Sequence, residues 1–178
     1  KYPDITLNII GGMLQPYTNK LKHRIKELRL CKKVFFSGKL PLHSDVINQI
    51  QLSKFAILPL KIDITSGTIR EAMFSGLPVI STITPGTPEL NKKRQSILLS
   101  EQGDHQTMAD NMINLIENPE LVQRLIENGL TTAKERWNNK KNMQQLVEAY
   151  KATINHHKYG IEIPAELGTK NPNINYAQ

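Results

Sequence analysis

Residues 55–82 read FAILPLKIDITSGTIREAMFSGLPVIST, and this stretch decides the fold class. The continuous apolar run at 55–60 is typical of a strand that is buried on both faces. A loop follows, and we expect the next helix at about 68–75, because Gly76 suits a left-handed C-terminal position and Pro78 prevents continuation. Pro78 then opens the next strand. A strand, a loop, a helix and a further strand in this order predict a parallel strand–helix–strand unit.

The same alternation continues on both sides of this stretch. Further strands are expected at 5–10, 34–36 and 96–100, with amphipathic helices between and after them. Ser44 or Asp45 is available to cap one helix, and other caps are expected at Asp104 and Asn118. Strands that alternate with helices at short spacing predict an α/β fold, with a doubly wound, Rossmann-like parallel sheet and helices on both faces.

The length of 178 residues allows one globular domain with a real core. We place this domain at 1–158. The segment 159–178 carries Pro164, Gly168 and Pro172 without periodicity, and we predict an irregular C-terminal tail there.

Charge and cysteine content narrow the classes of partner. The net charge is +7, but the basic residues are scattered and no aromatic residues interleave with them, so nucleic-acid binding ranks below a solvated surface and a membrane-facing patch. Cys31 is the single cysteine, which excludes an intrachain disulfide and fits a reducing compartment. The pair His156-His157 is interpreted as a polar helix end rather than a metal contact. No apolar run approaches the roughly 20 residues that cross a bilayer. We therefore expect a cytoplasmic location, with the inner face of the membrane as a second possibility.

The segment from Asp63 to Glu71 is the richest in candidate chemistry. It follows a buried strand and opens a helix, and ligands of parallel sheets bind at the carboxyl ends of strands. At Ser66, Gly67 and Thr68 the free backbone N–H groups of a helix start favour an anion. The Glu71 carboxylate, one turn further, can accept two hydrogen bonds from a vicinal diol such as a ribose, and Asp63 can bind a sugar hydroxyl. The alternative from spacing alone is a plain helix start, with Ser66 as its cap and Glu71 suited to the dipole.

Three other glycine turns follow expected strands. They are Gly11-Gly12, then Ser37-Gly38-Lys39, whose backbone groups can contact the edge of a base, and the loop around Pro85-Gly86. Ordinary strand-to-helix connections explain them equally well.

Several motifs of other enzymes are missing from the sequence. It contains no Gly-Lys-Ser or Gly-Lys-Thr loop, no Gly-x-Gly-x-x-Gly and no discernible Ser-His-Asp grouping. This argues against a P-loop nucleotidase and a dehydrogenase. No Asp-x-Asp cluster that could hold Mg²⁺ against a diphosphate is present either, so no metal site is expected.

Taken in order, these motifs resemble a known family. The strand ending at Gly11-Gly12, the run 34–38, the segment Glu71-Ala72-Met73-Phe74-Ser75-Gly76-Leu77-Pro78-Val79-Ile80 and the loop 85–90 resemble the C-terminal domain of group 1 (family 4) glycosyltransferases of the GT-B fold. The resemblance covers roughly residues 2–151, and its most specific part is 71–80.

The resemblance implies roles for individual residues. In that family two glutamates separated by seven residues line the donor site. The second matches Glu71, which would hold the ribose, and the first falls on Asp63, a shorter acid. The family's loop glycine lies one position before Gly67, and its later double glycine is Pro85-Gly86 here. The implied substrate is a nucleotide-sugar, UDP-linked by expectation, whose sugar is transferred with retention of configuration and without a metal or other cofactor.

The resemblance also implies parts that would lie before Lys1. These are a first strand–helix unit, whose strand is central in the family's sheet, and an N-terminal domain that binds a glycan or lipid-linked acceptor in polysaccharide or glycolipid assembly. Without that strand, two neighbouring strands should have unpaired edges, and the chain alone is expected to be inactive. Two alternatives stay open. One is a GT-B-like sugar-nucleotide epimerase, although no histidine lies in a candidate loop. The other is a non-catalytic nucleotide-binding module.

Overall fold

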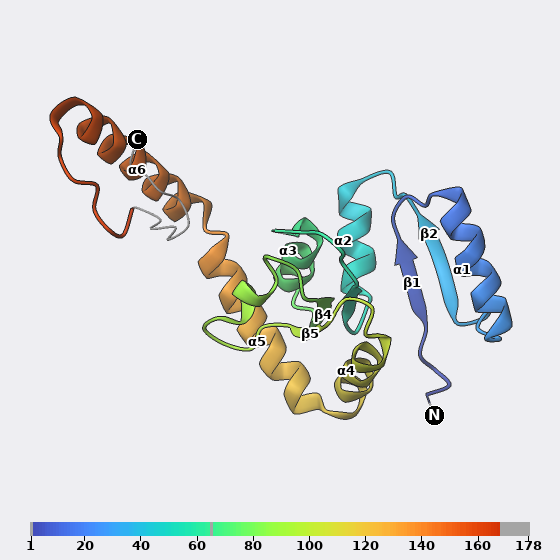
Figure 1. Ribbon diagram of the computed structural model, residues 1–178. Helices are drawn as coiled ribbons and strands as arrows, with labels where there is room; N and C mark the ends of the chain where they lie inside the picture. The colour runs from blue at the N-terminus through green and yellow to red at the C-terminus, as the bar shows by residue number, and fades with distance from the viewer. Residues whose placement is uncertain (1, 65, 168–178) are drawn as a thin grey trace. The chain divides into compact units, whose positions relative to one another are not determined.

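The computed structural model describes residues 2–64 and 66–167, and it divides into two compact units, residues 1–129 and 130–178, which are treated separately here (Figure 1). The elements, in chain order, are β1 (Leu7–Ile10), α1 (Gln15–Glu27), β2 (Val34–Gly38), α2 (His43–Gln51), β3 (Ala56–Leu58), α3 (Gly67–Phe74), β4 (Val79–Thr82), the 3-10 helix η1 (Pro88–Asn91), β5 (Leu98–Ser100), α4 (His105–Glu117), α5 (Pro119–Arg136) and α6 (Asn139–Tyr159).

All strand pairs in the described residues are parallel, which confirms the α/β class. They form a two-stranded sheet, β1–β2, and a three-stranded sheet in the order β3–β4–β5. Within the part of the chain that the structure describes, β1 therefore pairs only with β2, and β3 only with β4.

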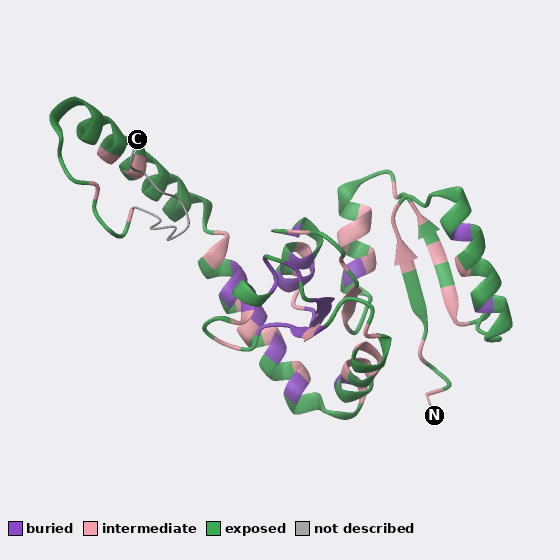
Figure 2. Ribbon diagram, viewed as in Figure 1, coloured by how far each residue is buried: buried purple, intermediate pink, exposed green. Residues whose placement is uncertain are grey.

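The core of the first unit lies around β4 and β5. Every residue of β4 is buried, and α4 packs against β4 and β5 while α3 packs against β3 and β4 (Figure 2). One cluster of buried apolar side chains consists of Ile80, Leu98, Leu115, Leu121 and Leu125. The prediction that the run 55–60 is buried on both faces was wrong, because β3 is only half-buried. It lies at an edge of its sheet, and an edge strand leaves one side open to water.

Local sequence signals explain most helix ends. Ser66 and Asp104 cap α3 and α4, with their side-chain oxygens accepting from the backbone N–H groups three residues on. Asn118 does the same ahead of α5. Gly76 has φ +72°, the left-handed conformation predicted at the end of α3.

The predicted cap of α2 was wrong. The N-cap is Leu42, because the helix begins at His43, and both Ser44 and Asp45 lie inside the first turn. From there the Asp45 carboxylate accepts a hydrogen bond from the backbone N–H of Leu42 at 3.3 Å. An acid in the first turn can therefore satisfy an orphan donor without being the cap itself.

The second unit contains the end of α5 and all of α6. Asn138 caps α6, and Gly160 ends it with φ +67°. The apolar residues at helical spacing on α6, such as Met143 and Tyr150, are exposed. Among the described residues, no helix combines the length and the apolar character needed to cross a membrane. Of the predicted tail 159–178, residues 168–178 lie outside the described residues.

Candidate functional site

The start of α3 lies directly after β3 and its loop, at the edge where parallel strands end. The Ser66 hydroxyl is nearly buried and accepts a hydrogen bond from the Ile69 N–H at 3.3 Å, which fixes the first turn. Gly67 and Thr68 are exposed, and a methyl group built on Gly67 would meet no atom of the described protein within 4 Å. The space beside Gly67, the first residue of α3, is therefore open, and the start of a helix is where an anion can bind.

The loop before α3 packs backbone to backbone against the loop after β4. A Cβ on Gly86 would lie 1.7 Å from the carbonyl oxygen of Ile64, so no other residue fits at this position without displacement. The Gln102 side chain joins the same two loops, because its Nε2 donates to the carbonyls of Lys61 at 2.8 Å and Ile83 at 3.0 Å. The structure thus brings together two segments that the sequence predicted as parts of one site. Gln102 was not predicted, since a lone glutamine in a loop has no distinguishing pattern.

The loop after β4 is held by buried hydroxyl groups. The Thr87 hydroxyl accepts from the Thr84 N–H at 2.9 Å and donates to the Thr82 carbonyl at 2.9 Å. The Thr82 hydroxyl donates in turn to the carbonyl of Leu60, at the end of β3. These bonds give the loop around Pro85 a fixed backbone, so its exposed part is presented in one conformation.

The glycine turns of β1 and β2 also meet. The N–H of Gly11, which has φ +133°, donates to the carbonyl of Gly38 at 2.8 Å. The Ser37 hydroxyl donates to the Asn8 side chain at 2.9 Å, so this hydroxyl already has a role within the strand pair. Gly12 and Lys39 are exposed beside these turns.

A histidine approaches Glu71 from another helix. The Nε2 of His43, the first residue of α2, lies 3.9 Å from an oxygen of the Glu71 carboxylate. The Glu71 side chain is 25% exposed, and that of His43 is 69% exposed. Sequence reasoning missed His43 because it lies outside the candidate loops, on a helix far from Glu71 along the chain. Asp63 lies half-buried in the loop between β3 and α3.

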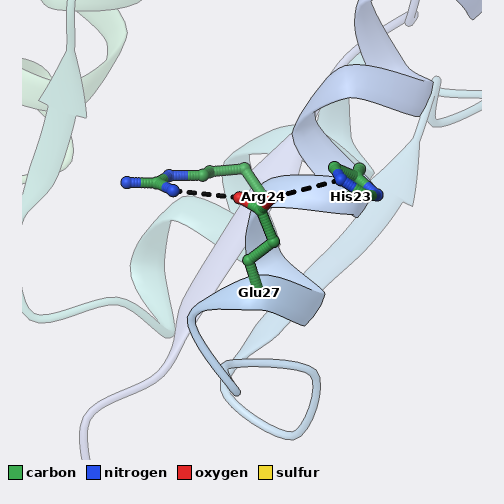
Figure 3. Close-up of polar contacts among 3 residues, drawn as sticks. All are labelled: His23, Arg24 and Glu27. Carbon is green, nitrogen blue, oxygen red and sulfur yellow. Dashed lines mark hydrogen bonds and ion pairs between the residues drawn. The ribbon is translucent and has the colours of Figure 1, made fainter.

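A second carboxylate with basic neighbours lies on α1 and provides a contrast. Glu27 contacts His23 Nε2 at 3.2 Å and Arg24 Nη1 at 2.9 Å within one helix (Figure 3). The hydrogen bond from Arg24 is the main reason that the pKa of Glu27 is lowered. This cluster lies in the last turns of a helix and has no glycine turn beside it, so we interpret it as a surface charge cluster.

The described residues contain no group of three or more histidine, cysteine or acidic side chains that could hold a metal ion. The candidate site offers the start of a helix, a carboxylate and hydroxyl-lined loops at the carboxyl edge of a parallel sheet. Groups of these kinds can accept hydrogen bonds from a diol and can bind an anion.

Comparison with protein families decides the identity of this fold and site. The family model of the group 1 glycosyl transferases matches residues 1–132. The chain belongs to this family. One relative, an uncharacterized glycosyltransferase of Haemophilus influenzae, is 26% identical over 155 residues, which are 86% of this chain and 41% of the relative. Another, the N-acetyl-alpha-D-glucosaminyl L-malate synthase of Bacillus anthracis, is 26% identical over 136 residues, 76% of this chain and 35% of the relative. The chain thus spans about two fifths of the length of these relatives.

Solved structures of the family share the fold. HepE of Anabaena, determined in complex with UDP, superposes with a TM-score of 0.75 at 23% identity and covers 84% of this chain and 42% of that one. HepE has also been determined with UDP-glucose. The C-terminal domain of LpcC, a group 1 glycosyl transferase of Francisella tularensis, gives 0.70 at 23% identity and covers 77% of this chain and 72% of that domain. The fold is that of the GT-B C-terminal domain.

Proposed function

We propose that this chain is the donor-binding part of a retaining glycosyltransferase. It would take a hexose or N-acetylhexosamine from a UDP-linked donor and pass it to a glycan or lipid-linked acceptor in polysaccharide or glycolipid assembly. The observation that carries the proposal is the position of Glu71, one turn into a helix whose first residue, Gly67, borders open space. The loop before this helix packs backbone to backbone against the loop around Gly86. The donor complexes of HepE support the nucleotide assignment.

Each segment then has a role in binding the donor. Glu71 would accept hydrogen bonds from the ribose diol, and the N–H groups at Ser66, Gly67 and Thr68 would bind the diphosphate. Asp63 would contact the donor sugar. A nucleoside diphosphate leaves during transfer, and fixed backbone donors stabilise the negative charge that develops on it.

The remaining segments would border the same ligand. Pro85-Gly86 would form the wall of the sugar site, and Ser37-Gly38-Lys39 would contact the base. Gly11-Gly12 would border the diphosphate.

Transfer itself would need protein beyond this chain. The relatives are more than twice as long as the matched part, and we propose that an acceptor-binding domain supplies the other wall of the cleft. The chain alone would then bind donor weakly and transfer no sugar. A cytoplasmic location is proposed, with the inner face of the membrane as the second possibility, since a net charge of +7 is attracted to anionic lipids.

Titration calorimetry with UDP and GDP tests the proposal. Glu71→Gln keeps the shape of the side chain but removes its charge, and should weaken binding by about 1.5–3 kcal/mol, the range for hydrogen bonds to charged groups. Glu27→Gln is the matched control, because Glu27 is also a helical acid beside a histidine. Equal affinities of the Glu71 variant and the unsubstituted chain would refute the ribose assignment. Chelator should leave the affinity unchanged, and loss of binding on chelation would refute a metal-free site.

One observation favours a second candidate, the sugar-nucleotide epimerase. His43 approaches Glu71, so a histidine does reach the candidate site, although none lies in its loops. An acid and a histidine together can move protons on a sugar. Incubation of the longer protein with UDP-N-acetylglucosamine, followed by NMR of the product, separates the two functions. A new epimer without acceptor would identify an epimerase, and transfer only in the presence of acceptor a glycosyltransferase.

A further inference from the structure

His43 and Glu71 face each other at a distance that is too long for a direct hydrogen bond. Their facing atoms, Nε2 and Oε1, are 3.9 Å apart, whereas nitrogen–oxygen hydrogen bonds span about 2.7–3.2 Å. The two residues come from different helices, α2 and α3, so the separation is set by how these helices pack. The His23–Glu27 pair on α1 contrasts with them, because it closes to 3.2 Å within one helix.

The opening between the two groups matches one hydroxyl oxygen. An oxygen placed at about 2.8 Å from each atom would see them at an angle of roughly 90°, which two hydrogen bonds to one hydroxyl tolerate. A hydroxyl donates one hydrogen bond and accepts others. It can therefore donate to the Glu71 carboxylate while it accepts from the Nε2–H of His43. We propose that His43 is a binding residue for the nucleotide's ribose, and that His43 and Glu71 hold one ribose hydroxyl between them.

Other parts of the ligand fit this opening less well. A phosphate offers only acceptors and a negative charge, which the Glu71 carboxylate repels. An N–H group of a base can donate to Glu71 but cannot accept from His43. A hydroxyl satisfies both residues, and the ribose is the hydroxyl-bearing part that the proposed function places at Glu71. The inference rests on that proposed function and adds a second residue, from another helix, that reads the sugar of the nucleotide.

The experiment compares three nucleotides on four proteins, the unsubstituted chain and three variants. Calorimetry measures the affinity of UDP, 2′-deoxy-UDP and 3′-deoxy-UDP for the unsubstituted chain, His43→Ala, His43→Gln and His23→Ala. His43→Ala should weaken UDP binding about three- to tenfold, the value of one net hydrogen bond. His43→Gln keeps an N–H donor and should recover most of that loss. His23→Ala removes a similarly exposed histidine next to a helical acid and should have no effect.

The deoxy nucleotides identify the bridging hydroxyl. The analogue that lacks it should bind the unsubstituted chain and His43→Ala with equal affinity, while the other analogue should still show the loss. A loss of the same size for all three nucleotides would overturn the proposal, because His43 would then act on the phosphates or on the fold. Circular dichroism melting of each variant checks the fold. Because the His43 side chain is largely exposed, its replacement should leave the Tm unchanged.

The result for the Glu71 variant separates a failure of the His43 proposal from a failure of the proposed function. If Glu71→Gln weakens UDP binding and His43→Ala does not, the ribose site stands and the role of His43 is refuted. If neither UDP nor GDP binds the unsubstituted chain, the proposed function fails, and the inference fails with it.

Discussion

The two sheets of the first unit are both parallel but are packed very differently. In the three-stranded sheet all four residues of β4 are buried, and α3 and α4 pack on its strands. In the two-stranded sheet no residue of β1 or β2 is fully buried, and α1 contributes only Thr18 and Ile25 to the interior (Figure 2). Both regions form parallel strands within the segments where the sequence predicted strands. A strand pair can therefore form from local pattern, whereas a core needs neighbours on both sides.

This difference bears on the candidate site. The segments around Glu71 and Gly86 belong to the well-packed sheet, and their loops are fixed by Gln102 and by the Thr87 hydroxyl. The turns at Gly11 and Gly38 belong to the two-stranded sheet and are joined by one backbone hydrogen bond. We expect the first group to keep its geometry without ligand, and the second to depend more on what binds there or packs beside it.

The largest expected effect comes from a core residue of β4. Ile80 is fully buried, so Ile80→Ala should lower the free energy of unfolding by about 2–5 kcal/mol, through lost burial and the cavity left behind. The matched change in the other sheet is Leu7→Ala in β1, where the side chain is 41% exposed. It should cost no more than about 1 kcal/mol, since little apolar surface returns to water. Urea unfolding followed by circular dichroism measures both.

Equal losses for the two variants would contradict this comparison. They would mean that β1 is as well packed in solution as β4, for example through pairing of its second edge. Hydrogen exchange then offers an independent check, because amide protons of β4 should exchange more slowly than those of β1.

Much of the fold was predictable from local signals. Ser66 and Asp104 were expected as caps, and Gly76 as a left-handed helix end, because each depends on one residue and its immediate neighbours. The burial of β3 was overestimated, since an apolar run indicates a strand but carries no information on how many neighbours that strand has. The cap of α2 was placed too late, because Asp45 acts equally well from inside the first turn.

The next effect is a difference in stability between alanine variants of Gly86 and Gly67, two glycines that were both predicted as parts of loops bordering the ligand. Gly86→Ala should destabilise the fold by about 1–3 kcal/mol, because the added Cβ overlaps the Ile64 carbonyl and the two loops must separate. Gly67→Ala should leave stability unchanged or slightly raised, since the Cβ meets nothing within 4 Å and alanine suits a helix. Thermal unfolding measures both effects on stability.

Calorimetry with UDP tests a separate effect of Gly67 on binding. Gly67→Ala should weaken UDP binding if a diphosphate approaches the start of α3, and full affinity would place the diphosphate elsewhere.

Residue spacing placed only those parts of the candidate site that are neighbours in sequence, whereas Pro85-Gly86 was assigned to it through the family resemblance. The strand, loop and helix of 55–75 showed where Ser66, Gly67 and Glu71 would lie, because one short segment contains all of them. His43 and Gln102 reach the same region through the packing of α2 and through the loop after β5. Neither has a spacing relation to Glu71, so only the three-dimensional structure shows them. The sequence also does not show why a glycine is needed at position 86, since the group that a Cβ would overlap is a backbone carbonyl rather than a side chain.

The smallest expected effect concerns the N-terminal caps of α4, which packs on the three-stranded sheet, and of α1, which lies between the two strands of the other sheet in the chain. Asp104 caps α4, whereas α1 begins at Leu14 with no side-chain cap. Hydrogen bonds from the Thr107 side chain and backbone N–H lower the pKa of Asp104 in the folded protein. A lowered folded-state pKa gives stability that is complete above the unfolded-state pKa, about 3.9, and is lost as the pH falls through the folded-state value.

Asp104→Ala should therefore lower the Tm at neutral pH, and the Tm difference from the unsubstituted chain should shrink as the solution is acidified below pH of about 4. Asp104→Ser keeps a capping oxygen without a charge and should show a higher Tm than the alanine variant throughout. Because Glu27 on α1 also has a lowered pKa, the same series is run in Glu27→Gln, which removes that contribution. A Tm difference between the unsubstituted chain and Asp104→Ala that stays constant down to pH of about 2 would show that the carboxylate charge does not stabilise α4.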